Sequence, residues 1–429
     1  MKKRILLISY YWPPAGGGGV QRWLKMSKYL PEMGYDLTVY TTSNGEAPVV
    51  DESLVNEVHP DIKVIQTPIW EPYSLYKKLT GRKKSEKVYS GFITDKKESW
   101  TQKLSVFIRG NFFIPDARKF WIRPSITFLK KYLKTNQVDV IISTGPPHSM
   151  HLIALGVTKE INIPWIADFR DPWTNIDFYD QLRLTDWADR KHKKLEQKVL
   201  ANATKVVTVS HSWANDFKRL SNREDILVIP NGFDHTDFEG DKVKLSPTFT
   251  LCHIGSMNKD RDPKALWGVL KKLVDAKRLE SLEIRLIGQV DHSIFHSIEV
   301  NGLTPYLKHI PFMPHDLVIT EIRKASVLLL PINDTPNSAG VIPGKLFEYM
   351  GANRPILGIG PIDGDSAKIL AETHAGVMID YNDTDSIETE ILRLSQDFNS
   401  GDLDIDSRGV EVYWRKSLAE RYGELFNAV

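Results

Sequence analysis

Short runs of Ile, Val and Leu alternate with longer amphipathic stretches along nearly the whole chain. The first unit has an apolar run at 4–10, a helical pattern at 20–33 and an apolar run at 36–42. This spacing predicts two parallel β-strands joined by a crossover helix. The alternation returns in apolar runs at 139–144, 165–169, 205–210 and 225–230, with a helical pattern at 186–201 among them. Strands that are apolar along their whole length are buried on both faces, so we predict a parallel sheet covered by helices.

The alternation stops once, in the middle of the chain, and then resumes. A polar stretch at 235–247 follows Asn231-Gly232-Phe233-Asp234. The second half then contains strand-like runs at 249–255, 282–288, 307–312, 326–332, 354–360 and 375–380. We therefore predict two domains of the same α/β kind, one over residues 1–235 and one over residues 248–409.

Two Rossmann-like sheets in one chain predict where a ligand would bind. Open parallel sheets take ligands beyond the carboxyl ends of their strands, so we expect an interdomain cleft there. The last helical pattern, at 410–426, predicts a closing helix, and we expect residues 410–429 to return to the first domain. The predicted fold class is α/β, with two facing Rossmann-like domains.

Composition restricts the class of protein further. The 429 residues are 41% hydrophobic and 26% charged, as in ordinary globular domains, and a net charge of +2 argues against chain-wide nucleic-acid binding. Cys252 is the only cysteine, which excludes an internal disulfide and favours the cytoplasm. Trp12-Pro13-Pro14 stands where a signal-peptide cleavage site would be needed, and no run approaches the roughly 18–20 apolar residues of a membrane span. We expect neither a signal peptide nor a membrane-spanning segment.

One segment breaks the even charge balance. Residues 77–134, within a predicted basic insertion at 70–134, hold 16 Lys/Arg and 4 Asp/Glu. Apolar and aromatic groups alternate with these cations at 104–108, 112–114 and 120–122. Two interpretations stay open: a peripheral contact with an anionic membrane surface, at the inner face of the cell membrane, or a solvated insertion that covers the first sheet.

A run of glycines follows the first predicted strand. Gly16, Gly17, Gly18 and Gly19 precede a helix, where glycine lets the backbone approach a ligand and aim amides at negative charge. A dinucleotide fingerprint needs a third glycine at the position of Gln21, so NAD is disfavoured. A tight structural turn is the alternative explanation.

Titratable residues follow two later strands of the first half. His148 lies just after the run at 139–144, while Asp168, Arg170 and Asp171 lie at the end of the run at 165–169. These positions fall where the cleft is expected. We predict that His148 positions a hydroxyl or the transferred group and that Asp168 and Arg170 hold or deprotonate an acceptor. For Asp171 we favour a turn cap paired with Arg170.

In the second half, two clusters are suited to a phosphorylated ligand. Gly255 and Ser256 end a strand, and Arg261 follows closely enough to reach back to a phosphate. A small-residue loop containing Gly340 and Val341 leads into a helix that carries Lys345 and Glu348 one turn apart. Near the positive end of that helix, Lys345 suits a diphosphate and Glu348 suits paired sugar hydroxyls. A surface ion pair is the alternative for these two residues.

Taken in order, these features resemble the retaining glycosyltransferases of family 4, which have the GT-B architecture. The resemblance covers essentially the whole chain. The segments that carry it are 16–19, 145–149, 168–173, 230–234, Gly255 with Arg261, and 343–350. It implies transfer of a sugar, of hexosyltransferase type, from a nucleotide-sugar donor to a glycan or polyprenyl-linked acceptor in surface polysaccharide biosynthesis, such as lipopolysaccharide or capsule.

The chain departs from the family pattern at two positions. The family carries two glutamates at the positions of Gly340 and Glu348, so the one that commonly reads the donor sugar is missing. It also often carries Arg and Lys where this chain has Ser256 and Arg261. We therefore expect the reaction class to hold while the identity of the donor sugar stays open.

The resemblance implies a metal-independent mechanism with no cofactor. Arg261, Lys345 and the helix that follows Pro343 would stabilise the leaving diphosphate, so that the acceptor attacks from the same face. His148 would orient the donor sugar, and the loop 16–19 would receive acceptor or diphosphate. A sugar-nucleotide epimerase on the same fold and a catalytically silent sugar-nucleotide-binding protein remain alternatives, and a dehydrogenase is a distant one.

Overall fold

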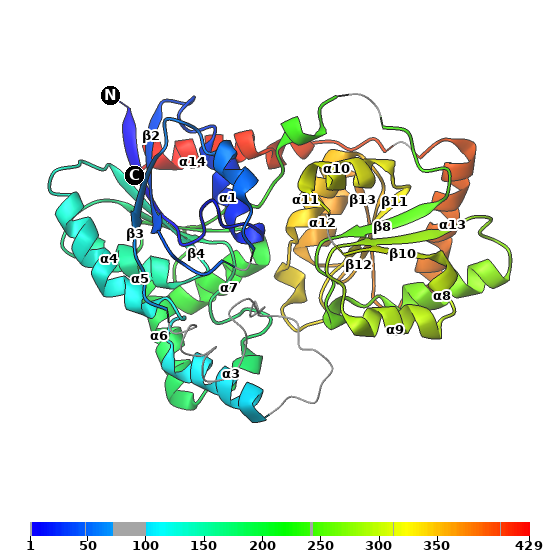
Figure 1. The fold of residues 1–429 in the computed structure, drawn as a ribbon, viewed down its shortest axis with the longest axis horizontal. Coiled ribbons are helices and arrows are strands. Elements are labelled where there is room, and N and C mark those ends of the chain that lie inside the picture. Colours follow the sequence, from blue (N-terminus) through cyan, green and yellow to red (C-terminus); the bar gives the residue numbers. More distant parts are fainter. Residues whose placement is uncertain (1, 48, 72–99, 241–242, 312, 404) are drawn as a thin grey trace. The chain divides into compact units, whose positions relative to one another are not determined.

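The computed structural model describes residues 2–47, 49–71, 100–240, 243–311, 313–403 and 405–429. The chain divides into two compact units. Unit 1 contains the described residues up to Pro230 together with Arg415–Val429, and unit 2 contains those within Asn231–Trp414. Figure 1 shows a helix-covered sheet in each unit.

The described residues of unit 1 form a seven-stranded sheet in the order β3-β2-β1-β4-β5-β6-β7. Every neighbouring pair in it is parallel. Its strands are β1 (Lys3–Ile8), β2 (Tyr35–Thr42), β3 (Lys63–Thr67), β4 (Val140–Gly145), β5 (Trp165–Phe169), β6 (Lys205–Thr208) and β7 (Ile226–Val228). The helices are α1 (Gly18–Ser27), α3 (Trp100–Phe112), α4 (Lys119–Tyr132), α5 (Ser149–Thr158), α6 (Asp186–Asn202), α7 (His211–Ser221) and α14 (Arg415–Asn427).

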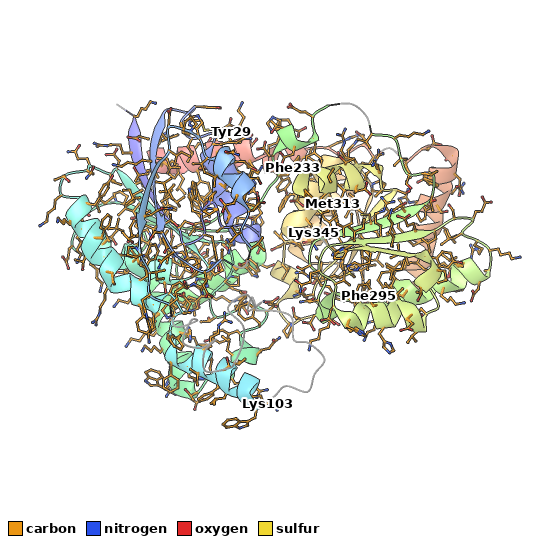
Figure 2. All side chains as sticks on the ribbon, in the orientation of Figure 1. Tyr29, Lys103, Phe233, Phe295, Met313 and Lys345 are labelled. Carbon is orange, nitrogen blue, oxygen red and sulfur yellow. The ribbon has the colours of Figure 1, made fainter. Side chains whose placement is uncertain are left out.

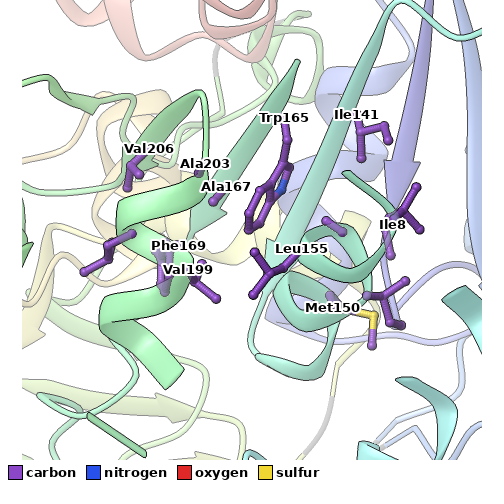
Figure 3. Packing of buried hydrophobic residues seen from close by; sticks show 14 of the residues in the cluster. Ile8, Ile141, Met150, Leu155, Trp165, Ala167, Phe169, Val199, Ala203 and Val206 are labelled. Atoms are coloured by element: carbon purple, nitrogen blue, oxygen red, sulfur yellow. The ribbon is translucent and has the colours of Figure 1, made fainter. Parts of the chain in front are cut away.

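Successive residues of the central strands enter different cores, because side chains alternate across a strand. Trp165, Ala167 and Phe169 of β5 pack with α5 and α6 in one cluster, shown in Figure 3. Ile166 of the same strand belongs to the cluster that contains α1 and α14. Helix α14 therefore belongs to unit 1 through its apolar face, which includes Tyr422.

Unit 2 repeats the plan with a six-stranded parallel sheet among its described residues, in the order β10-β9-β8-β11-β12-β13. Its strands are β8 (Thr250–Ile254), β9 (Glu283–Ile287), β10 (Leu307–Ile310), β11 (Val327–Pro331), β12 (Ile356–Ile359) and β13 (Gly376–Ile379). Its helices are α8 (Lys264–Asp275), α9 (His292–Val300), α10 (His315–Lys324), α11 (Gly344–Ala352), α12 (Asp365–Thr373) and α13 (Thr384–Ser400). Hydrophobic clusters lie on both faces of this sheet as well.

The structure corrects two element predictions. Strand β3 was not predicted, because this edge strand is largely exposed and lacks a continuous apolar run. The closing helix α14 begins at Arg415 rather than at Val410, because Val410–Tyr413 is a 3-10 turn and Trp414 is extended. Of the predicted basic insertion, residues 72–99 lie outside the described residues, and residues 100–134 contain α3 and α4.

No helix in the described part of the chain is long and apolar enough to cross a membrane.

Candidate functional site

A tight glycine turn ends strand β8 in unit 2. Gly255 has a φ of +84°, a conformation that L side chains rarely adopt. A Cβ on Gly288, at the end of the neighbouring strand, would lie 2.5 Å from the Gly255 carbonyl oxygen. The Gly255 amide donates to the Ile287 carbonyl oxygen at 2.7 Å. These two glycines therefore let two strand ends approach closely and fix the carbonyl of the next residue, Ser256.

Helix α11 brings Lys345 to this turn. Lys345 is labelled on α11 in Figure 2, in the first turn of the helix. Its Nζ lies 3.0 Å from His253 Nε2 and 3.3 Å from the Ser256 carbonyl oxygen. Pro343 at the N-cap makes no side-chain cap, and the first turn contains no acidic residue. The positive end of the helix dipole and the ammonium group therefore occupy the same end of α11.

His253 is the site residue that sequence reasoning missed. It is fully buried in β8, and its Nδ1 lies 3.0 Å from the Leu329 carbonyl oxygen. A carbonyl only accepts, so Nδ1 carries the proton and Nε2 accepts from Lys345. Burial, with Lys345 and Arg261 nearby, lowers the pKa of His253 well below its usual range. The imidazole is therefore neutral, and a histidine within an apolar strand was the only signal for it in the sequence.

Arg261 joins Lys345 at the same oxygen atom. Its Nη1 donates to the Ser256 carbonyl oxygen at 3.1 Å, and its Nε donates to Oδ1 of the buried Asn333. Burial first and Arg261 second lower the pKa of Lys345 well below its ordinary value, while Glu348 on the same helix opposes this shift. Two basic side chains thus converge on one carbonyl at the N-terminus of α11.

Gly340 and Val341, two further residues predicted to bind the donor, lie in the loop that precedes α11. Gly340 is buried and ends a 3-10 turn at Ser338–Gly340, and the Val341 carbonyl accepts from Ser366 Oγ of α12 at 2.7 Å. The loop before α11 is therefore tethered to α12. The structure brings together Gly255, Ser256, Arg261 and Lys345. A dianion fits this arrangement, because charge-assisted hydrogen bonds and a helix N-terminus both favour it.

In unit 1, Arg170 ties the glycine run to a second loop. Its Nη1 donates to the Gly19 carbonyl at 2.7 Å and its Nη2 donates to the Pro146 carbonyl at 3.3 Å. Gly17 has a φ of +84° and stands at the N-cap of α1, without a side-chain cap. A Cβ at Gly17 or Gly18 would meet no described atom within 4 Å. Gly17 and Gly18 are therefore exposed at a helix N-terminus, whereas Gly16 is buried and Gly19 is half-buried.

Asp168 corrects a prediction, since it is fully buried rather than open to an acceptor. Its carboxylate accepts from Arg22 at 3.1 Å, Trp23 at 2.7 Å, Thr144 at 2.9 Å and Tyr422 at 2.8 Å. Burial alone would raise its pKa, but Arg22 and the hydrogen bonds hold the pKa of Asp168 below its usual value. Both oxygens are thus occupied in the core, where Asp168 joins α1, β4, β5 and α14.

His148 is 7% exposed and stacks on Trp173, with ring centroids 4.9 Å apart. Burial, reinforced by His151 and Arg170, lowers the pKa of His148 well below 6.5, so its ring is neutral. Its Nδ1 has no hydrogen-bond partner among the described residues. Asp171 pairs with Arg170 at 3.6 Å, as the simpler interpretation predicted.

Comparisons with known proteins agree with this fold. Residues 92–237 match the family model described as Glycosyltransferase Family 4. No curated protein matches the chain. Among solved structures, sucrose-phosphate synthase from Thermosynechococcus elongatus is similar with a TM-score of 0.63 at 13% identity, over 100% of this chain and 99% of that one.

Two further solved structures are similar over nearly their full length. WaaG, a glycosyltransferase involved in lipopolysaccharide biosynthesis, has a TM-score of 0.55 at 14% identity, over 99% of this chain and 100% of that one. A putative UDP-N-acetylglucosamine 2-epimerase from Listeria monocytogenes has a TM-score of 0.56 at 10% identity, over 100% of this chain and 96% of that one. At these identities the likeness establishes the fold, that of two Rossmann-like GT-B domains.

Proposed function

We propose that this chain is a glycosyltransferase that moves a sugar from a nucleotide-sugar donor to a glycan or polyprenyl-linked acceptor. The observation that carries the proposal is the convergence of Arg261 and Lys345 on the Ser256 carbonyl oxygen at the N-terminus of α11. The match of residues 92–237 to a glycosyltransferase family supports the reaction class.

In this proposal the donor diphosphate binds to Arg261, Lys345 and the first amides of α11. The bond from the sugar to the diphosphate breaks and leaves negative charge on the phosphate oxygens, which these groups stabilise. His253 keeps the ammonium of Lys345 in place with a neutral acceptor, so the positive charge of Lys345 stays available to the phosphates. Glu348 accepts hydrogen bonds from the ribose hydroxyls.

Unit 1 receives the acceptor. The loop 16–19, held by Arg170, binds the acceptor or a phosphate of it, and neutral His148 orients the donor sugar. The acceptor hydroxyl attacks the anomeric carbon from the face that the diphosphate leaves and gives its proton to a diphosphate oxygen, so the anomeric configuration is retained. We propose that the cations named above provide the charge stabilisation and that no metal ion is needed. Asp168 has no part in this step, because its oxygens are occupied in the core.

The biological setting proposed is surface polysaccharide biosynthesis at the cytoplasmic side of a membrane, with transfer of a hexose. A lipopolysaccharide glycosyltransferase of the same fold supports this setting. The acceptor would then be lipid-linked.

The first test is thermal unfolding of the purified chain with UDP, GDP, ADP, dTDP and CMP sugars, with NAD as control and EDTA present. A bound donor raises the melting temperature by mass action. We expect one nucleotide class to stabilise the chain, and the anomeric configuration of the transferred sugar is then read by NMR. Stabilisation by NAD alone would refute the proposal.

A second candidate function is epimerisation of the sugar nucleotide, which the fold of a putative 2-epimerase favours. The two functions differ in their need for an acceptor. A transferase releases nucleoside diphosphate only when a suitable acceptor is present, whereas an epimerase converts the donor sugar alone. Analysis of donor incubated without acceptor separates them.

A further inference from the structure

Helix α3 of unit 1 carries a stripe of exposed apolar side chains. Trp100, Leu104, Ile108 and Phe112 follow one another at four-residue spacing, and their exposures are 75%, 40%, 39% and 63%. Residues at this spacing lie on one face of a helix. A helix within a globular domain ordinarily buries such a stripe.

The position of α3 is fixed by contacts near its C-terminal end. Asn111 is buried, donates to the Arg183 carbonyl at 3.1 Å and accepts from the Thr185 amide at 2.7 Å. A Cβ on Gly110 would lie 2.9 Å from the Leu182 carbonyl oxygen, so the helix packs closely there. Because Gly110 and Asn111 are anchored in this way, the exposed stripe is a stable feature of this surface.

Further exposed aromatic side chains accompany the stripe. Trp70 is 58% exposed and Phe120 is 40% exposed, and their rings meet edge to face at 4.8 Å. Lys119 lies over the Phe120 ring at 5.2 Å and donates to the Phe112 carbonyl at 2.7 Å, which links this pair to α3. We call Trp70, Trp100, Leu104, Ile108, Phe112 and Phe120 the α3 face.

The segment of sequence that contains α3 and α4 is basic. Between positions 100 and 134 the sequence has eight Lys/Arg and one acidic residue, Asp116. That carboxylate accepts from the Ser149 amide at 2.8 Å and from its hydroxyl at 2.7 Å, so it caps α5. Lys103, labelled in Figure 2, and Arg109 lie on α3 itself. Exposed aromatic side chains among excess positive charges are complementary to a partner that has an apolar interior and negatively charged groups at its surface.

We propose that the α3 face docks on an anionic lipid bilayer, with its aromatic rings at the headgroup level. Trp and Phe suit that level because they carry large apolar rings, and Lys and Arg suit the lipid phosphates. A protein partner fits less well, because basic residues outnumber acidic ones by eight to one between positions 100 and 134. Docking would hold the enzyme near a lipid-linked acceptor. Only this purpose of the docking rests on the proposed function.

The test is co-sedimentation of the full chain with vesicles of phosphatidylcholine alone and of phosphatidylcholine with phosphatidylglycerol. We expect binding to the anionic vesicles that weakens as salt rises, since surface charges are screened. The triple variant Trp100→Ser, Ile108→Ser, Phe112→Ser should bind at least ten-fold more weakly. The variant Lys103→Glu, Arg109→Glu should lose binding to anionic vesicles by a similar factor.

A matched control is Val300→Ser with Ile362→Ser, two exposed apolar residues of unit 2 at 70% and 63% exposure. This control should bind vesicles as the unchanged chain does. Absence of vesicle binding by the unchanged chain would overturn the proposal, as would full binding by either α3 variant. Self-association through the α3 face, seen as a concentration-dependent mass that the triple variant loses, would also overturn it.

Donor-induced thermal stabilisation of each variant keeps this inference separate from the proposed function. The triple variant should keep that stabilisation while losing vesicle binding. If the triple variant fails to fold, the charge variant decides, since its substitutions lie on exposed or half-buried positions of α3. If no donor stabilises even the unchanged chain, the proposed function fails, and the vesicle result still decides the docking surface.

Discussion

Replacing Lys345 with methionine separates ligand binding from stability at the candidate donor site. Lys345 and Arg261 both donate to the Ser256 carbonyl oxygen, at 3.3 Å and 3.1 Å, so the two donor nitrogens lie no more than the sum of these distances apart, about 6.4 Å. Two like charges at that separation repel by about 3 kcal/mol at an effective dielectric constant of about 20. A bound diphosphate would attract both cations, and this attraction would offset their mutual repulsion.

Lys345→Met should therefore have a small effect on the stability of the empty protein and a large effect on turnover of the bound donor. In the empty protein it removes the repulsion, but it leaves the buried Nε2 of His253 without its donor, which costs about 1–3 kcal/mol. These terms offset each other, so the free energy of unfolding should change by only about 1 kcal/mol. In the loaded protein the loss of a charge-assisted contact should lower kcat/KM by about 2–4 kcal/mol, roughly 30- to 1000-fold.

The assay is release of nucleoside diphosphate from the donor in the presence of acceptor, with urea unfolding measured on the same samples. Lys368→Met is the matched control, because Lys368 is an exposed lysine of α12 that pairs with Asp365. It should leave both readouts unchanged. Near-normal turnover by Lys345→Met would refute the assignment of the donor site, and a large loss of stability would refute the electrostatic reasoning.

Three other substitutions test separate parts of the structure. Glu348→Ala should lower kcat/KM by about 2–4 kcal/mol with unfolding unchanged, and equal losses for donors that have and lack a ribose 2′-hydroxyl would contradict its role. Asp168→Asn should lower the free energy of unfolding by about 3–5 kcal/mol, since it leaves the Arg22 charge unpaired in the core, whereas a change below about 1 kcal/mol would contradict this. Burial raises the pKa of Glu196 to about 7, so between about pH 4.5 and 7 the native state holds a proton that the unfolded chain releases. Stability should fall over that window by up to about 1.4 kcal/mol per pH unit, and Glu196→Gln should flatten the slope in urea titrations.

The sheets were predictable from the sequence because their central strands are buried on both faces. Residues 327–330 form one continuous apolar run, and β11 occupies Val327–Pro331. The edge strand β3 carries no such signal, since its side chains are mostly exposed. The hydrophobic pattern of a sequence therefore indicates which strands are buried, and it does not predict a strand that is exposed.

The candidate site was predictable only in part. The turn at Gly255 and the helix carrying Lys345 were predicted, because glycine conformation and helix polarity are local properties. The acceptor role predicted for Asp168 was wrong, because an aspartate at a strand end can face either the solvent or the core. Its partners Arg22 and Tyr422 lie far from it in sequence, so no local sequence pattern predicts these contacts.

Because α14 is the last helix of the chain and belongs to unit 1, the two units are completed at different times during synthesis. The described residues of unit 2 all lie within Asn231–Trp414, so all of its strands are synthesised before α14. Unit 1 is discontinuous, and the hydroxyl of Tyr422 that completes the Asp168 cluster arrives 254 residues after that carboxylate. Domains generally fold as units during synthesis. The unit that begins first is thus the one that finishes last, and until then its α1 side lacks the helix that covers it.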